Sequence, residues 1–119
     1  MEKILLVEDN KNITLSVMMC LENAGYEVVV VENGIKAVDR ALSQKPDLIL
    51  LDILIPKMNG YLVCEALRDE EKTKEVPIVM LSAKAEEEDI KKARKLGADD
   101  YLVKPFEPKE LLIIVKENI

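Results

Sequence analysis

Short runs of apolar residues alternate with segments of helical hydrophobic spacing along the whole chain. The runs of strand length cover residues 3–8, 27–31, 47–52, 77–82 and 100–104. Three of them are unbroken, which is typical of strands buried on both faces of a sheet. Strands that alternate with helices predict an α/β fold, with a parallel sheet, right-handed crossovers and helices on both faces.

The segments between these runs place apolar residues three or four positions apart, as amphipathic helices do. The predicted stripes are Ile13, Val17 and Leu21; Ile35, Val38 and Leu42; Leu62, Val63, Ala66 and Leu67; Ile90, Ala93 and Leu96; and Leu111, Leu112 and Val115. Gly25 and Gly97 each follow a stripe and predict helix C-termini, and Pro108 predicts a first helical turn. We expect five helices in one domain that spans residues 1–119.

The composition, with 49% hydrophobic and 34% charged residues, is that of a globular protein. The apolar runs are too short to cross a membrane, and "MEKILLVED" is too short to be a secretory signal. We therefore expect a cytoplasmic protein without membrane contact. The net charge is −6 and the Lys and Arg residues are scattered, which argues against nucleic-acid binding by this chain.

The chain has no histidine and two cysteines, Cys20 and Cys64. The absence of histidine excludes histidine general bases and most zinc sites. The cysteines form either a disulfide or redox pair, or two small buried hydrophobic residues. The cytosolic context favours the second interpretation.

Polar residues stand at the predicted carboxyl ends of four strands. They are Glu8 and Asp9, Asp52, Ser82 and Lys104. Carboxyl ends of parallel strands share one edge of the sheet, where the ligand sites of open α/β sheets lie. Polar residues also end strands without any function, but five of them at four strand ends favour a site.

The predicted cluster suits a hard cation and phosphoryl chemistry. Three neighbouring carboxylates repel one another unless a proton or cation lies between them, and an all-oxygen ligand set favours Mg²⁺. We expect Asp52 to be exposed at the tip of its strand, with its charge compensated by the ion and by Lys104. Such a carboxylate can attack phosphorus, while Mg²⁺, Lys104 and Ser82 each take a phosphoryl oxygen and the small Ala83 leaves the approach open.

The sequence resembles the response-regulator receiver domains of two-component signalling. The resemblance runs from Lys3 to the end of the chain and rests on "LLVEDN", "DLILLDILIPKMNG", "PIVMLSAKA" and "GADDYLVKPF". It implies a flavodoxin-like, doubly wound sheet of order 2-1-3-4-5. It also implies that Asp52 accepts a phosphoryl group from a sensor histidine kinase or a His-phosphotransfer protein. The domain then changes conformation to control a partner, and it does not act as an enzyme on other substrates.

The resemblance assigns a role to each site residue. The implied Mg²⁺ ligands are Glu8, Asp9, Asp52 and the backbone carbonyl of Leu54; the phosphoryl group is bound by Lys104 and Ser82; the switch residues are Ser82 and Tyr101; the contacts to the phosphoryl donor are Ile13, Thr14, Pro105 and Phe106. A cis peptide bond between Lys104 and Pro105 is implied as well.

Several of these features have a simpler interpretation when they are taken alone. Tyr101 is equally explained as an edge-strand aromatic residue, Pro105 as a strand-ending proline and Gly60 as a residue that only serves helix entry. The run "EEEDIKKARK" (86–95) is either a solvated helix face or part of the surface that changes on phosphorylation. In the implied topology Cys20 and Cys64 lie on opposite faces of the sheet, so we expect no disulfide.

Three positions depart from the common pattern of the family. Glu8 replaces a more usual aspartate and reaches farther, so we expect it to contact the metal through water. Leu54 and Lys84 occupy positions that tune dephosphorylation in the family. Because Leu54 has no polar group to orient an attacking water, we expect a long-lived phosphoryl group.

Other functions make different demands on the sequence. A magnesium-dependent phosphohydrolase needs a second acid two residues after its nucleophile, where this chain has Leu54. A flavodoxin-like mononucleotide binder needs a Ser-, Thr- or Gly-rich loop after the first strand, whereas "VEDNKN" presents acids. A binding module that is never phosphorylated does not need the complete acidic set. The sequence identifies no kinase, signal or output, and it fits both a free-standing receiver and part of a longer regulator.

Overall fold

The computed structural model describes residues 1–119 as strictly alternating strands and helices. The strands are β1 (Lys3–Val7), β2 (Glu27–Val31), β3 (Leu48–Asp52), β4 (Ile78–Ser82) and β5 (Asp100–Val103). The helices are α1 (Lys11–Asn23), α2 (Gly34–Gln44), α3 (Gly60–Asp69), α4 (Glu87–Lys95) and α5 (Pro108–Asn118). The predicted elements are confirmed, and each strand ends within one residue of its apolar run.

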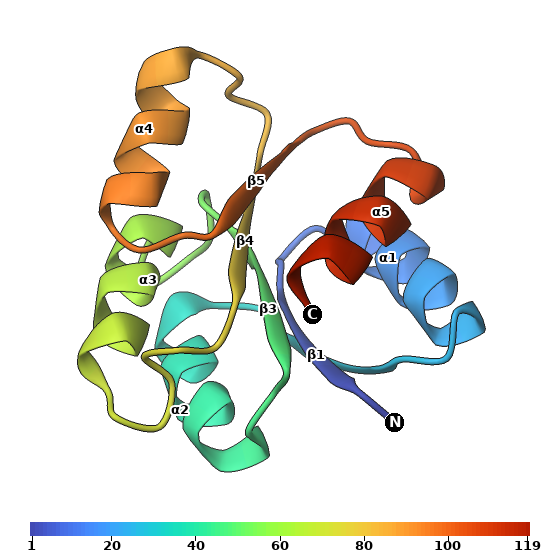
Figure 1. Cartoon of the computed structure of the whole chain (residues 1–119), viewed down its shortest axis with the longest axis horizontal. Coiled ribbons are helices and arrows are strands. Elements are labelled where there is room, and N and C mark those ends of the chain that lie inside the picture. Colours follow the sequence, from blue (N-terminus) through green and yellow to red (C-terminus); the bar gives the residue numbers. More distant parts are fainter.

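All neighbouring strands are parallel, and their order is β2-β1-β3-β4-β5. Helices α1 and α5 cover one face of the sheet, and α2, α3 and α4 cover the other (Figure 1). The predicted doubly wound fold is therefore confirmed. The strand order reverses between β1 and β3, so the carboxyl ends of these two strands lie side by side at the position where open α/β sheets bind ligands.

An apolar core lies on each face of the sheet, because successive strand residues point to opposite sides. In β3, Leu48 and Leu50 belong to the core under α1 and α5, whereas Ile49 and Leu51 belong to the core under α2, α3 and α4. Every residue of β3 and β4 is buried. The valine-rich β2 is only partly buried because it lies at an edge of the sheet and pairs with β1 alone.

The predicted stripe of α2 is wrong at Ile35, whereas Val38 and Leu42 of the same stripe are partly buried and Val38 packs against the core. Its buried residues include Ala37 and Ala41, whereas Ile35 is 56% exposed. The two alanines lie one turn apart, and their small side chains let α2 pack closely. The centre of the buried face is therefore shifted from the large apolar residues to the neighbouring alanines. Leu62 of α3 is likewise exposed, whereas Val63 and Leu67 of its predicted stripe are buried.

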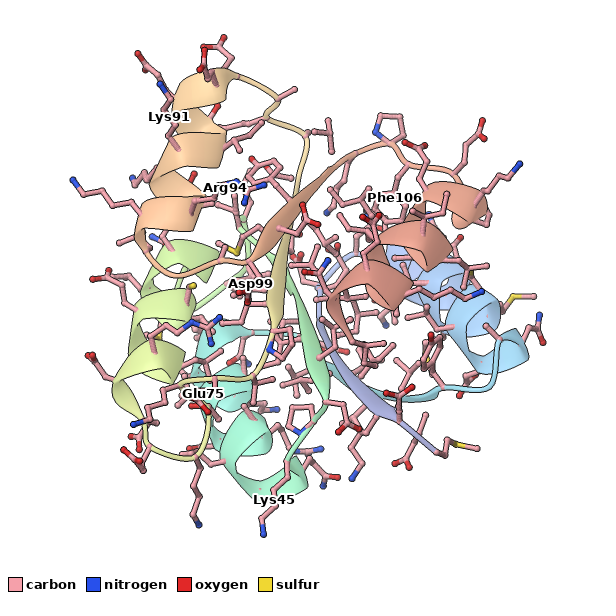
Figure 2. All side chains as sticks on the ribbon, viewed as in Figure 1. Lys45, Glu75, Lys91, Arg94, Asp99 and Phe106 are labelled. Carbon is pink, nitrogen blue, oxygen red and sulfur yellow. The ribbon has the colours of Figure 1, made fainter.

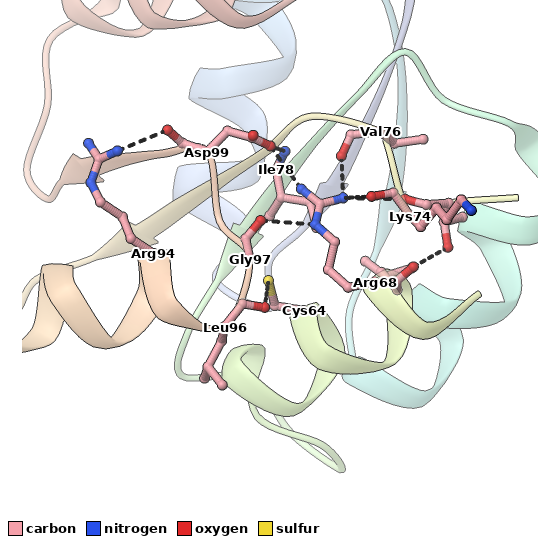
Figure 3. A network of polar contacts seen from close by, with 11 residues as sticks. Cys64, Arg68, Lys74, Val76, Ile78, Arg94, Leu96, Gly97 and Asp99 are labelled. Atoms are coloured by element: carbon pink, nitrogen blue, oxygen red, sulfur yellow. Dashed lines mark hydrogen bonds and ion pairs between the residues drawn. The ribbon is translucent and has the colours of Figure 1, made fainter. Parts of the chain in front are cut away.

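A polar network around Arg68 holds the end of the sheet opposite the strand carboxyl ends (Figure 3). Arg68 donates through Nε to the carbonyl of Gly97 at 2.9 Å and through Nη1 to the carbonyl of Val76 at 2.7 Å. Its Nη2 lies 2.8 Å from Oδ2 of Asp99. These contacts connect the segment before β4 to the segment before β5 and fix the C-terminal end of α4.

The cysteines lie on opposite faces of the sheet, as the topology implies. Cys64 is buried on α3, and its Sγ donates to the carbonyl of Leu96 at 3.4 Å. Cys20 lies on α1 beside the other core. Both thiols are free, which confirms that they form no disulfide. No helix of the structure combines the length and the apolar character that crossing a bilayer requires.

Candidate functional site

The acidic side chains predicted to converge do so at the carboxyl edge of the sheet. Glu8 and Asp9 follow β1, and Asp52 is the last residue of β3. One carboxylate oxygen from each of the three lies within 4.8 Å of the other two. Ser82 ends β4 at the same edge, where its carbonyl accepts the backbone N–H of Lys104 at 2.8 Å.

Lys104 follows the edge strand β5, and its side chain pairs with two of the carboxylates. Its Nζ donates to Oε1 of Glu8 at 2.8 Å and to Oδ2 of Asp52 at 3.0 Å. The other oxygen of Asp52 accepts the backbone N–H of Leu54 at 3.1 Å. The predicted compensation of Asp52 by Lys104 is therefore confirmed.

The prediction that Asp52 is exposed at a strand tip is wrong. Asp52 is only 5% exposed and Glu8 only 1%. The carboxylate of Asp52 accepts hydrogen bonds from the N–H of Leu54, in the turn after β3, and from the ammonium group of Lys104. A carboxylate tolerates such burial when it is paired and hydrogen-bonded, and both conditions are met here.

The cluster carries more negative than positive charge. The cluster has three carboxylates and one ammonium group, which pairs with Glu8 and Asp52, while Asp9 is exposed to solvent. All available donor atoms are oxygens, which are the ligands of hard divalent cations. The residues present therefore fit a cation such as Mg²⁺, which would supply the missing positive charge.

The burial of the cluster changes its proton affinities. Burial raises the pKa of Glu8 above its usual 4.5, and the neighbouring Asp52 raises it further, although Lys104 and the N–H of Asn10 oppose the change. Burial alone would lower the pKa of Lys104, but its hydrogen bonds to Glu8 and Asp52 outweigh burial and leave this pKa above 10.5. Lys104 is therefore a permanent cation at neutral pH.

We expect the substitution Glu8→Gln to remove a pH-dependent loss of stability in metal-free buffer. A carboxyl group whose pKa is raised by folding binds its proton more tightly in the folded state, so stability falls as pH rises from 4.5 through the folded-state pKa. The free energy of unfolding of Glu8→Gln, measured by urea denaturation, should therefore increase relative to the parent chain over this interval. Mg²⁺ should reduce the difference, and Glu2→Gln, at an exposed position, is the control. Parallel pH profiles for Glu8→Gln and the parent chain would contradict this prediction.

The backbone of Lys84 links Ser82 to Tyr101. Oγ of Ser82 accepts the N–H of Lys84 at 3.1 Å, and the carbonyl of Lys84 accepts the hydroxyl of Tyr101 at 2.8 Å. The sequence places Ser82 and Tyr101 on neighbouring strands but cannot predict this link, because it runs through backbone N–H and C=O groups that all residue types except proline share.

The residues predicted to contact a phosphoryl donor divide between two hollows. Ile13, Pro105 and Phe106 line a groove of about 350 Å³ between α1 and the connection from β5 to α5, where Figure 2 labels Phe106. Thr14 lies on the other side of α1, in a hollow of about 240 Å³ that Glu8 also lines. The peptide bond between Lys104 and Pro105 is cis, as the resemblance implies.

The fold and this cluster agree with one protein family. The sequence profile described as "Response regulator receiver domain" matches residues 4–116, which is nearly the whole chain. This chain belongs to the response regulator receiver domain family.

Two curated relatives of the receiver are transcriptional regulators. Over 115 residues it is 44% identical to the alkaline phosphatase synthesis transcriptional regulatory protein PhoP of Bacillus subtilis, covering 97% of this chain and 47% of that protein. Over 116 residues it is 41% identical to the DNA-binding dual master transcriptional regulator RpaA of Synechocystis, covering 98% of this chain and 48% of that protein. The receiver spans about half the length of these relatives.

Solved structures share the fold of the receiver over its whole length. The chemotaxis protein CheY4 of Vibrio cholerae superposes with a TM-score of 0.95 at 34% identity, covering 100% of this chain and 99% of that one. The receiver domain of the sensor histidine kinase PA1611 of Pseudomonas aeruginosa superposes with a TM-score of 0.91 at 38% identity, covering 98% and 96%. A magnesium ion is coordinated in the active-site cleft of that second structure.

Proposed function

We propose that Asp52 accepts a phosphoryl group from a sensor histidine kinase or a His-phosphotransfer protein in a Mg²⁺-dependent reaction. The observation that carries this proposal is the position of Asp52, which lies within 4.8 Å of two further carboxylates and 3.0 Å from the ammonium group of Lys104. A carboxylate held in this way is both a metal ligand and a nucleophile. The phosphorylated domain then changes conformation and controls a partner.

Each residue around Asp52 has a separate role in phosphoryl transfer. Glu8, Asp9, Asp52 and the carbonyl of Leu54 would hold Mg²⁺, which would supply positive charge next to the phosphoryl oxygens. An oxygen of Asp52 forms a bond to phosphorus as the P–N bond of the donor phosphohistidine breaks, and the electron pair of that bond leaves with the imidazole. Lys104 and Ser82 bind the phosphoryl oxygens, Lys104 through its charge and Ser82 through its hydroxyl.

The switch consists of Ser82 and Tyr101, which share Lys84 as a common hydrogen-bond partner. When the hydroxyl of Ser82 turns to the phosphoryl group, the N–H of Lys84 loses its acceptor and the segment that leads to α4 rearranges. Tyr101, which donates to the carbonyl of Lys84, then changes position with it. The surface of α4, β5 and α5 carries this change to a downstream partner.

The donor contacts Ile13, Thr14, Pro105 and Phe106, beside the phosphorylated residue. The apolar groove between α1 and the β5–α5 connection supports this proposal, because Lys104 of the acidic cluster also lines it. A kinase helix in this groove would present its phosphohistidine at the carboxyl edge of the sheet. We place this exchange in the cytoplasm.

The proposal is tested with acetyl phosphate or phosphoramidate and intact-mass spectrometry. With Mg²⁺ the chain should gain a single phosphoryl group, and with excess EDTA it should gain none. Steady turnover of phosphate esters would indicate a phosphohydrolase instead. A mass that stays unchanged with Mg²⁺ would indicate a binding module that is not phosphorylated.

We expect the phosphoryl group to persist for minutes or longer with Mg²⁺ present. The side chain of Leu54 is 65% exposed at the site and offers no group that could orient an attacking water. Loss of radiolabelled phosphoryl group should therefore speed up in Leu54→Asn, whose amide can bind water, and should not change in Leu54→Met. A half-life of seconds in the parent chain would contradict this expectation.

A further inference from the structure

Two Asn–Gly pairs flank the loop that joins β3 to α3, which is the loop that carries Leu54. Asn33 precedes Gly34 at the start of α2, and Asn59 precedes Gly60 at the start of α3. Both asparagines are helix N-caps, whose Oδ1 atoms accept backbone N–H groups at 3.0 Å and 3.1 Å. The pairs thus fix the first turns of two helices beside the same loop.

Both glycines donate their N–H groups to this loop. Gly34 donates to the carbonyl of Pro56 at 3.1 Å, and Gly60 donates to the carbonyl of Ile53 at 2.8 Å. The carbonyl of Pro56 also accepts the N–H of Met58 at 2.9 Å. The loop is therefore attached at one point to its own helix, α3, and at another to α2, a helix that contributes no residue to the acidic cluster.

The close approach of these backbones explains why both positions are glycine. A Cβ atom at Gly34 would lie 2.0 Å from the carbonyl oxygen of Met58, and one at Gly60 would lie 2.6 Å from that of Asp52. In both cases the obstacle is backbone, which cannot rotate away as a side chain can. Neither glycine has a positive φ, so contact and not backbone conformation excludes a side chain here.

Within the loop that joins β3 to α3, Leu54 lies between two buried residues. Ile53 is 3% exposed and Ile55 is 9% exposed, so both anchor the loop in the core, while the side chain of Leu54 points to solvent. Buried neighbours on both sides and the hydrogen bonds of Gly34 and Gly60 leave the peptide of Leu54 little freedom. Mg²⁺ requires near-ideal octahedral geometry, so a carbonyl ligand must be held in this way.

We propose that the Asn33–Gly34 and Asn59–Gly60 pairs fix the Leu54 carbonyl for Mg²⁺, which makes Gly34 of α2 a positioning residue for the metal site. This inference rests on the proposed function, since it takes Leu54 as a metal ligand. Coupling is reciprocal, so Mg²⁺ bound at the acidic cluster must also stabilise the start of α2.

The first test compares the Mg²⁺ affinity of the parent chain, Gly34→Ala and Gly25→Ala by isothermal titration calorimetry. Gly25 is the matched control, because its φ of 95° makes alanine strained while no atom lies within 4 Å of the added Cβ. Substitutions behind a metal's ligands cost about tenfold to a hundredfold in affinity, and we expect a loss of that size for Gly34→Ala. Gly25→Ala should lose stability and keep its affinity. A folded Gly34→Ala chain with parental affinity would overturn the inference.

The second test uses the unmodified chain and so does not depend on the folding of a variant. With Mg²⁺ at about 100 times its Kd, hydrogen exchange of the Gly34 amide should slow by about tenfold or more. Exchange of the Gly25 amide, which donates to Glu22 at 3.0 Å, serves as the reference. Unchanged exchange at Gly34 in a chain that binds Mg²⁺ would overturn this inference alone. A chain that binds no Mg²⁺ would overturn the proposed function as well.

Discussion

Replacement of Lys104 by methionine is expected to lower the free energy of unfolding by about 3 kcal/mol at neutral pH in metal-free buffer. The ammonium group is the only cation paired with the buried carboxylates of Glu8 and Asp52, at 2.8 Å and 3.0 Å. Methionine keeps the length of the side chain, so the loss reflects charge and not a cavity. Lys116→Met, at an exposed lysine of α5, should change stability by less than about 0.5 kcal/mol.

The pH dependence of the Lys104→Met variant distinguishes charge from packing. The pKa of Lys104 is raised in the folded state, so its contribution is fully present below pH 10.5 and is lost as pH rises through the folded-state pKa. The variant should lack this alkaline loss, and acid should reduce its deficit because the carboxylates become protonated. Urea denaturation across this range measures both effects. A deficit that is the same at every pH would show that Lys104 acts through packing.

Lys104→Met should also slow phosphorylation by acetyl phosphate even where the chain remains folded. Removal of one preorganised group that stabilises developing charge typically costs a factor of about 100 to 1,000 in rate. Mg²⁺ should restore part of the stability of the variant, because the ion supplies positive charge to the same carboxylates. It should not restore the rate, because the phosphoryl oxygens still lack the ammonium group.

Asp52→Asn is expected to abolish phosphorylation and to leave the protein folded. A carboxamide oxygen is too weak a nucleophile to attack phosphorus, whereas the side chain keeps the size of the carboxylate and can still accept one of the two hydrogen bonds that Asp52 receives from Leu54 and Lys104. The substitution also removes one negative charge from a cluster that has an excess of them, so it should not destabilise the chain through repulsion. Intact mass after treatment with phosphoramidate and Mg²⁺ should equal that of the untreated variant.

The matched control for Asp52→Asn is Asp39→Asn, an equivalent change at an exposed position of α2. It should gain one phosphoryl group as the parent chain does. Circular dichroism should show parental helix content in both variants. A phosphorylated Asp52→Asn chain would mean that another residue is the acceptor.

The strands, their parallel arrangement and the acidic cluster could be predicted because the information lies in local sequence, whereas the strand order was implied by the resemblance to receiver domains. Unbroken apolar runs such as residues 48–51 define buried strands, and the polar residue that ends each run marks the carboxyl edge of the sheet. Once the strands are parallel, Glu8, Asp52 and Lys104 are expected at the same edge of the sheet. Because β4 separates β5 from β3, the contacts of 2.8 Å and 3.0 Å from Lys104 to Glu8 and Asp52 depend on the length of the lysine side chain.

Other features could not be predicted because they depend on packing between elements that are distant in sequence. Asp52 is buried with partners that the apolar run before it does not reveal, namely the N–H of Leu54 in the following turn and the side chain of Lys104. The buried face of α2 depends on two alanines that a search for large apolar residues passes over. The hydrogen bond from the N–H of Gly34 to the carbonyl of Pro56 joins two backbone groups, so the identity of the side chains does not predict it.

Borohydride reduction of the phosphorylated chain tests most directly whether the carboxylate of Asp52 is the nucleophile. Hydride converts an aspartyl phosphate to homoserine, whereas a phosphate ester of serine or tyrosine is not reduced in this way. Peptide mass spectrometry after phosphorylation with Mg²⁺ should find homoserine at position 52 and unmodified aspartate at position 9. Homoserine at any other position, or a phosphate ester on Ser82 with an intact Asp52, would contradict the account.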